Sequence, residues 1–321
     1  MSETGTIIAL VADAEELAVW EPIFTRLEEK LLLVEMIEIP GVISNLRKRG
    51  ASVSLVMIST RVYPLGYPKL VSQARQLFPD ADIMLMCLST DPPPPLSPLL
   101  VDNIRHLLIN PVGGPFYDLD RVVSLFNLSI RRLKNSIPLS MADYIRPGTS
   151  VHEYRVSSSE QKEELIAKLE KTIGGYSQEY EMLRMKGALL ADEMLENAFY
   201  AAPRDGHSEP LYRKGEKRKM ADGENVIFRY GFDGETLALE VTDGWGTLSS
   251  EDLFRHLTQH FDKLGVHEEI GGRGLFIIWR FLDTLLIRID PGKQTVIGGH
   301  VRLSTSNFLP EIKGFHIATG P

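Results

Sequence analysis

The sequence predicts an α/β protein built from two domains, a doubly wound N-terminal domain followed by a second α/β domain. In the first half, short apolar runs alternate with amphipathic stretches, as in a parallel sheet that helices cover on both faces. In the second half, two amphipathic helical stretches precede pairs of strand-like runs. The length of 321 residues fits two domains, taking about 150 residues for each.

The composition is that of a soluble globular protein, with 43% hydrophobic and 24% charged residues. A net charge of −8 argues against a general nucleic-acid binder, because such domains are usually basic. The single cysteine, Cys87, excludes a disulfide framework or a cysteine-rich metal site and fits the reducing cytoplasm. The acidic start lacks a signal-peptide pattern, and no apolar run is long enough to span a bilayer. We therefore expect a cytoplasmic protein that contacts neither nucleic acid nor membrane.

Five apolar runs in the first half predict the strands of the first sheet. They lie at residues 6–12, 31–39, 52–59, 82–89 and 104–110. Helices are expected over Glu15–Glu29, Val42–Arg49, Lys69–Phe78 and Asp120–Asn135. The stretch "DPPPPLSPLL" after the fourth strand is expected to run extended, because proline lacks the backbone donor that a helix interior needs.

From Thr6 to about Lys134, this order of elements resembles the receiver domain of two-component response regulators. That family carries an acidic pair, a phospho-accepting Asp, a Ser or Thr and a Lys after strands one, three, four and five. The corresponding positions here are Ala12-Asp13, Ser59, Ser89-Thr90 and Asn110. An aspartyl-phosphate site needs carboxylates for Mg²⁺, a carboxylate nucleophile and a balancing cation. The resemblance is therefore to a pseudo-receiver with a regulatory or dimerising role, and an unrelated flavodoxin-like domain is the alternative.

The second domain is expected to follow a linker rich in turn residues. Residues 136–150, "SIPLSMADYIRPGTS", read as that linker, which gives a pseudo-receiver domain at 1–135 and a second domain at 151–321. In the second domain, strands are expected at 151–156, 225–232, 236–243, 283–289 and 295–304. Helices are expected at 157–173 and 180–202, and again on each side of the last glycine motif.

Three short motifs follow one another in this second domain. "DEMLENA" places Glu193 and Asn197 four residues apart, on one face of a helix. "DGWG" begins with Asp243 at a strand end, and "GGRGLF" begins with Gly271 and leads into a helix, whose free N–H groups suit an anion. Each motif alone also fits an ordinary turn or a solvated helix face.

In this order, the motifs resemble the N, G1 and G2 boxes of the GHKL (Bergerat) ATPase superfamily, which includes gyrase B and histidine kinases. The resemblance covers roughly Val151 to Ser304 and implies a two-layer α/β sandwich that binds ATP and Mg²⁺. It implies that Asp243 accepts a hydrogen bond from the adenine amino group, with Gly244 and Gly246 beside the base and the ribose. It implies Asn197 as the Mg²⁺ ligand. It also implies that the triphosphate lies along Gly272, Arg273 and Gly274, under a lid formed by residues 263–271.

Glu193 indicates which branch of the superfamily the chain resembles. Sensor histidine kinases usually carry Asn at this place, and the nearby His152 lies in a predicted strand. Glu instead resembles the anti-sigma-factor serine kinases and the ATP-hydrolysing branches. It implies that Glu193 deprotonates an attacking hydroxyl, from Ser or Thr of a partner protein or from water.

The predicted function is phosphorylation of Ser or Thr on a partner protein, regulated by the phosphorylation-incompetent receiver-like domain. Two alternatives stay open: a non-catalytic ATP-dependent partner-binding switch, and a phosphorelay kinase acting in trans. The resemblance therefore leaves open whether the protein is an enzyme. Homodimerisation fits both modules, although no residue establishes it.

The chain departs from the anti-sigma pattern at residues 203–224, a polar insertion with a cluster of cations. These are Arg213, Lys214, Lys217, Arg218 and Lys219. A solvated hairpin or disordered loop is favoured over a docking patch for an acidic partner. His256 and His260 have a metal-binding spacing, but Leu257 replaces the HExxH glutamate, so ordinary helix residues are favoured. Trp245 in the G1 box is expected either to pack in the core or to cover the base.

Overall fold

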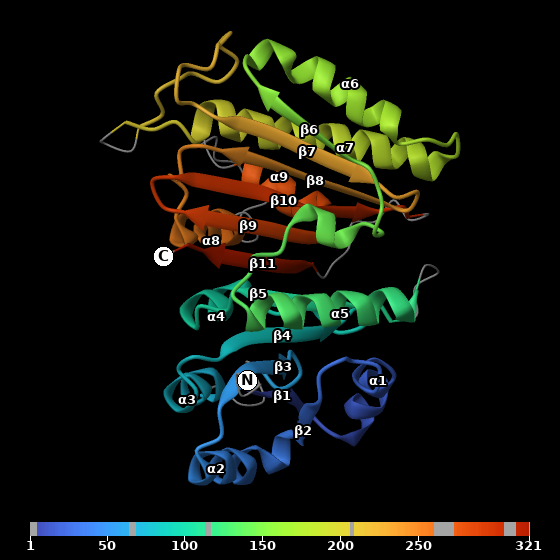
Figure 1. Cartoon of the computed structure of the whole chain (residues 1–321), viewed down its shortest axis with the longest axis vertical. Helices are drawn as coiled ribbons and strands as arrows, with labels where there is room; N and C mark the ends of the chain where they lie inside the picture. The colour runs from blue at the N-terminus through green and yellow to red at the C-terminus, as the bar shows by residue number, and fades with distance from the viewer. Residues whose placement is uncertain are drawn as a thin grey trace. The chain divides into compact units, whose positions relative to one another are not determined.

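The computed structural model describes residues 5–63, 69–112, 117–205, 209–259, 273–304 and 313–320 of the chain (Figure 1). The chain divides into two compact units, Met1–Leu139 and Ser140–Pro321. Strands and helices occur in both units, which confirms the predicted α/β class. Within the described ranges, none of the helices has the length and apolar character needed to cross a membrane.

The first unit contains a parallel sheet with the strand order β2-β1-β3-β4-β5. Its strands are β1 (Thr6–Val11), β2 (Leu31–Glu35), β3 (Val53–Ser59), β4 (Asp82–Leu88) and β5 (His106–Asn110). Its α-helices are α1 (Ala14–Phe24), α2 (Ile39–Arg49), α3 (Leu70–Leu77), α4 (Leu96–Val101) and α5 (Leu119–Lys134). This strand order also occurs in the doubly wound fold of flavodoxin.

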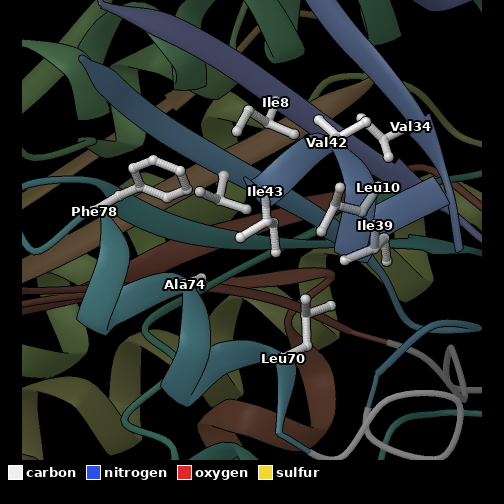
Figure 2. A pocket seen from close by; sticks show the side chains of 10 residues that line it. Ile8, Leu10, Val34, Ile39, Val42, Ile43, Leu70, Ala74 and Phe78 are labelled. Atoms are coloured by element: carbon white, nitrogen blue, oxygen red, sulfur yellow. The ribbon is translucent and has the colours of Figure 1, made fainter. Parts of the chain in front are cut away.

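Helices cover both faces of this sheet. On one face, α1 and α5 bury Trp20, Ile23 and Phe126 against the strands. On the other face, α2 and α3 meet β1 and β2 around a small apolar space (Figure 2). That space is about 10 Å³ and all its lining side chains are apolar, so it offers a water no hydrogen bond. It is therefore a packing feature of the core and not a ligand site.

Capping residues explain where two of these helices begin. Asp13 caps α1 by accepting a hydrogen bond from Glu16 N at 2.9 Å. Asp118 caps α5 in the same way, accepting from Arg121 N at 3.2 Å. Asp is among the preferred residues at this position, because its short carboxylate satisfies a backbone donor that the helix leaves free.

Two predictions for the first unit are wrong in detail. The strand predicted over 31–39 ends at Glu35, and the 3₁₀ turn η1 (Met36–Glu38) leads directly into α2. Ile37 is 87% exposed, so the apolar run continues past the strand without being buried. The stretch predicted to run extended is non-helical only up to residue 95, and its second half forms α4, with Pro98 inside the first turn, where proline leaves no helical hydrogen bond unmade.

Glu16 is hydrogen-bonded to Ser59, the residue that the resemblance places at the phospho-acceptor position of receiver domains. Ser59 at the end of β3 is fully buried, and its hydroxyl donates to Glu16 Oε1. Glu16 Oε1 also accepts from Trp20 Nε1 at 3.2 Å, and Glu16 Oε2 accepts from Ala12 N at 2.7 Å. The carboxylate at this sheet edge is thus held by three donors of the protein itself, which the sequence analysis did not foresee.

Ser59→Asp would place a second carboxylate against the buried carboxylate of Glu16. We expect it to lower the free energy of unfolding by about 3 kcal/mol, because an unpaired buried charge is strongly destabilising. Ser59→Ala removes only the hydroxyl, and we expect a loss of about 1 kcal/mol. Chemical unfolding of the two variants and the parent chain measures the difference. Equal losses in both variants would contradict the crowded carboxylate pair.

The second unit contains a mixed sheet with the strand order β11-β9-β10-β8-β7-β6. The strands are β6 (Val151–Val156), β7 (Val226–Phe232), β8 (Thr236–Asp243), β9 (Thr284–Asp290), β10 (Gln294–Arg302) and β11 (Gly314–Thr319). Neighbours from β6 to β9 are antiparallel, whereas β11 runs parallel to β9. The sequence analysis ended the sheet at β10, so β11 is an additional strand that was not predicted.

Within the described residues, four α-helices pack on one face of this sheet. They are α6 (Lys162–Thr172), α7 (Gln178–Glu196), α8 (Ser250–Gln259) and α9 (Arg273–Phe281), with the short 3₁₀ turn η3 (Ser159–Gln161) before α6. Helix α7 lies against Leu237 of β8 at Gly187. Helices α8 and α9 contact Phe315 of β11 through Phe254 and Trp279. The strand registers put Leu237 and Phe315 on the same face of the sheet.

The predicted linker contains a segment that packs on this sheet. The 3₁₀ turn η2 (Met141–Tyr144) lies beside β8 and β10. Met141 N donates to Glu240 Oε2 at 3.1 Å, and the Tyr144 ring stacks on His300 at 4.4 Å between ring centroids. Residues from Ser140 onward therefore belong to the second compact unit.

Candidate functional site

Glu193 and Asn197 lie on the same side of the helix that carries the N-box motif, and both face Gly274. A Cβ built on Gly274 would stand 2.9 Å from Glu193 Oε2 and 2.9 Å from Asn197 Oδ1. Such distances are shorter than any Cβ tolerates, so glycine allows α9 to approach these two side chains. Two motifs that are far apart in the sequence therefore meet at one point.

Asn197 begins a π-helical turn, η4 (Asn197–Ala201), which continues α7. Ala202 N donates to Asn197 O at 2.8 Å, which is the wider spacing of a π turn. Such turns inside α-helices often mark functional positions. Among the residues that the structure describes, the Nδ2 atom of Asn197 is buried without a hydrogen-bond partner, and an orphaned buried amide of this kind is rare in a folded protein. The sequence predicted Asn197 on this helix, but not the change of helix type.

Asp243 ends β8 and is only 5% exposed. Its Oδ1 atom accepts from Trp245 N at 2.9 Å and from Gly246 N at 3.3 Å, so the carboxylate caps its own turn. Burial raises the pKa of Asp243 to about 6, and the backbone donors of the turn oppose that rise. A buried carboxylate with a displaced pKa is typical of a functional site and also of a structural turn.

The turn after Asp243 is linked to the end of the π-helical segment. Thr247 Oγ1 donates to Ala202 O at 2.7 Å. Gly244 packs against Asn225, with 3.3 Å from a built Cβ to Asn225 Cβ. The ends of α7 and β8 are thus held side by side, and the Nε1 atom of Trp245 is buried without a hydrogen-bond partner in the described part of the chain.

Other predicted site residues are placed only in part. Gly272, the predicted lid at 263–271 and His260 lie outside the described residues. Arg273 is the first residue of α9. His256 lies in α8, and among the residues that the structure describes no group of three or more His, Cys, Asp or Glu side chains is arranged to hold a metal ion.

Most described residues of the insertion at 203–224 are exposed, which agrees with the prediction of a solvated segment, but Arg218 within it is buried, which was not predicted. Arg218 is 5% exposed and forms an ion pair with Glu224. Its Nη1 atom donates to Phe199 O in η4, and its guanidinium lies 3.7 Å from the centroid of the Tyr212 ring. No pattern in the sequence separated Arg218 from the cations around it.

The neighbouring basic residues and backbone also contact the unit. Lys217 pairs with Glu160 at 2.8 Å, and Lys214 lies 3.8 Å from Glu196. Ser159 N donates to Arg218 O, and Met220 N donates to Ser157 O, both at 2.9 Å. Lys214 and Lys217 stay largely exposed despite these contacts, with 67% and 83% of their side chains accessible, so the structure leaves the alternative of a basic docking patch untested.

Comparisons with known proteins give two weak similarities. No family model matches the chain. The prolyl oligopeptidase ophP of Omphalotus olearius is 29% identical over 154 residues, which are 48% of this chain and 18% of that protein. The response regulator LqsR of Legionella pneumophila aligns over 96% of this chain and 91% of its own, with a TM-score of 0.28 and 10% identity. Neither similarity shows the family of this chain.

Gly246→Ala tests how tightly the turn after Asp243 is packed. Gly246 has φ of 61°, and a built Cβ would stand 2.6 Å from Lys293 N. We expect a loss of about 3 kcal/mol in the free energy of unfolding, from backbone strain and collision together. The matched control is Gly234→Ala, since Gly234 has φ of 94° but no atom within 4 Å of a built Cβ. That control should lose only about 1 kcal/mol, and equal losses would contradict the packing.

Asp243→Asn tests the raised pKa of Asp243. The folded protein binds this proton more tightly than the unfolded chain, so stability falls as pH rises from about 4, the ordinary value, to the folded value of about 6. We expect the stability of the parent chain, relative to Asp243→Asn, to fall by up to about 3 kcal/mol across this window. Urea unfolding of both proteins between pH 4 and pH 7.5 measures it. A relative stability that rises with pH would contradict burial as the cause.

Proposed function

We propose that the second unit binds Mg²⁺-ATP in a GHKL-type site and transfers phosphate to Ser or Thr of a partner protein. The observation that carries the proposal is the convergence of Glu193 and Asn197 on Gly274. The carboxylate of Glu193 and the amide of Asn197 lie next to Gly274, near the start of α9. Each of the three residues is of the type that the resemblance requires at its position. The spacing of the motifs in the sequence alone does not bring these three residues together.

The residues present fit the nucleotide and the metal ion. Asn197 Oδ1 supplies a hard oxygen ligand of the kind that Mg²⁺ prefers. Arg273 and Gly274 begin a helix of nine residues, whose N-terminal N–H groups favour phosphate oxygens. Asp243 receives the adenine amino group, with Gly244 and Gly246 beside it, while Gly272 and the lid at 263–271 complete the site by resemblance.

Glu193 acts on the proton of the attacking hydroxyl. Bound ATP supplies the phosphoryl group, and Mg²⁺ neutralises the charge on its oxygens. Glu193 lies on the same helix face as Asn197, so a hydroxyl next to the metal-bound phosphate comes within reach of its carboxylate. The protein is thus proposed as a cytoplasmic kinase, with water as the acceptor when no partner hydroxyl is present.

The first unit is proposed as the regulatory, pseudo-receiver part, through which two copies of the chain associate. Ser59 and Glu16 support this proposal, because the position of a phospho-acceptor is occupied by a buried internal hydrogen bond. Peptidase activity is not proposed. The matching oligopeptidase is covered over only 18% of its length, and the nucleophile motif G-x-S-x-G of serine hydrolases does not occur in the 321 residues.

Titration calorimetry with Mg²⁺-ATP tests the site. We expect the parent chain to bind in the micromolar range, about −8 kcal/mol. Asp243→Ala should abolish binding, because the adenine loses its acceptor. Asn197→Ala should weaken binding by about tenfold when Mg²⁺ is present and leave binding in a chelator unchanged. A parent chain that binds no ATP would overturn the proposal.

Phosphate transfer from labelled ATP to proteins of the host cell tests the chemistry. Glu193→Ala should retain ATP binding and lose transfer by 10²-fold or more, the usual contribution of a general base. Stability of the product to acid, with lability to base, identifies phosphoserine or phosphothreonine. Binding of ATP without any transfer would instead favour the non-catalytic switch, and an acid-labile product would favour the phosphorelay kinase.

A further inference from the structure

The π-helical turn that begins at Asn197 is held by side chains from outside its own helix. Phe199 O accepts from Arg218 of the insertion. Ala202 O, just after the turn, accepts from Thr247 of the G1 segment at 2.7 Å. A π turn widens the helical hydrogen-bond ring, and the carbonyl of Phe199 turns to the guanidinium of Arg218.

Arg218 makes three contacts of its own, although its Nε and Nη2 atoms are buried without a hydrogen-bond partner among the described residues. Its ion pair with Glu224 is almost wholly buried, with 4% of the Arg218 side chain and 8% of the Glu224 side chain exposed. Tyr212 stacks on the guanidinium, and its hydroxyl donates to Glu224 Oε1 at 3.3 Å. The planar guanidinium therefore joins a carboxylate, an aromatic face and the carbonyl of η4, which an ammonium group does not do in the same geometry.

A second contact reaches the residue just before Asn197. Glu196 Oε1 accepts from Lys162 Nζ of α6 at 2.6 Å. Lys214 of the insertion lies 3.8 Å from the other oxygen of Glu196. The insertion thus approaches both ends of the short segment from Glu196 to Phe199.

We propose that Arg218 is a positioning residue for Asn197, so that the insertion at 203–224 sets how well the proposed ATP site holds Mg²⁺. This inference rests on the proposed function. Mg²⁺ accepts little departure from octahedral geometry, so a ligand atom displaced by a few tenths of an ångström contributes much less to the affinity for the ion. Without Arg218, the carbonyl of Phe199 loses its donor, and the turn can return to ordinary α-helical spacing. We expect that change to disturb the side chain of Asn197, whose carbonyl begins the turn.

Two variants of Arg218 and one matched control test the proposal. Arg218→Met keeps the length and removes the guanidinium, while Arg218→Lys keeps the charge and removes the planar fork. Lys217→Met is the control, because Lys217 is the adjacent cation of the same insertion but its side chain is 83% exposed and pairs only with Glu160 among the described residues. The experiment measures ATP affinity by calorimetry over a Mg²⁺ series and in a chelator. Hydrogen exchange of the backbone amides from 197 to 202 is measured without nucleotide.

For Arg218→Met we expect the Mg²⁺ concentration needed for half of the metal-dependent gain in affinity to rise at least tenfold. Affinity in the chelator should change less than threefold, since Asp243 is untouched. Arg218→Lys should fall between Arg218→Met and the parent chain, and Lys217→Met should match the parent. Amide exchange from 197 to 202 should accelerate in Arg218→Met and not in Lys217→Met.

An unchanged Mg²⁺ dependence in Arg218→Met would overturn the proposal, as would equal losses with and without Mg²⁺, which indicate a general loss of structure. Should Arg218→Met fail to fold, Arg218→Lys gives the same comparison. A parent chain that binds no ATP would overturn the proposed function. In that case, unchanged amide exchange in Arg218→Met would separately overturn the positioning of η4.

Discussion

Two close approaches in the second unit occur at glycines, where neighbouring side chains lie in the space that a Cβ would take. Gly187 brings α7 down onto Leu237 of the sheet, where a Cβ would stand 2.6 Å from a Leu237 methyl group, and Gly274 brings α9 against Glu193 and Asn197. The first approach fixes the depth of α7 above the sheet, and the second fixes α9 relative to α7. Close-packed layers of this kind transmit small displacements, so the polar groups between α7 and α9 depend on both glycines.

Glu16 and Asp243, two of the buried carboxylates among the described residues, differ in how they are held. In the first unit, Glu16 is held by two side chains and a backbone amide, through both oxygens. In the second unit, Oδ1 of Asp243 accepts from two backbone amides of its own turn. Thr295 interacts with the same carboxylate, while burial raises its pKa. Both carboxylates are thus held by internal donors, which compete with a ligand for the same lone pairs, so a ligand at Asp243 has to share the carboxylate with the turn.

The sequence predicted features that depend on neighbouring residues in the chain and missed those that depend on distant ones. Apolar runs and capping residues located most strands and helices, and the spacing of Glu193 and Asn197 put them on one helix face. The meeting with Gly274 rests on the motif resemblance and not on any local pattern. Strand β11 was missed because its short run pairs with β9 only in the folded sheet. Arg218 was missed because its burial depends on Glu224 and Phe199, which sit in different elements.

The buried pair of Arg218 and Glu224 is better explained by geometry than by stability. Removing two charges from water is unfavourable, and their attraction in the interior offsets this only in part, so such a pair adds little net stability over apolar side chains of the same size. The pair orients the guanidinium. Glu224 and the Tyr212 ring hold it in place, and it donates a hydrogen bond to the carbonyl of Phe199 in η4. An apolar side chain would fill the same space but would offer no donor to the carbonyl of Phe199, so it would not favour π-helical over α-helical spacing at Asn197. On our proposal, the insertion acts through this carbonyl on the helix it contacts, and Arg218 is the group that orients Asn197.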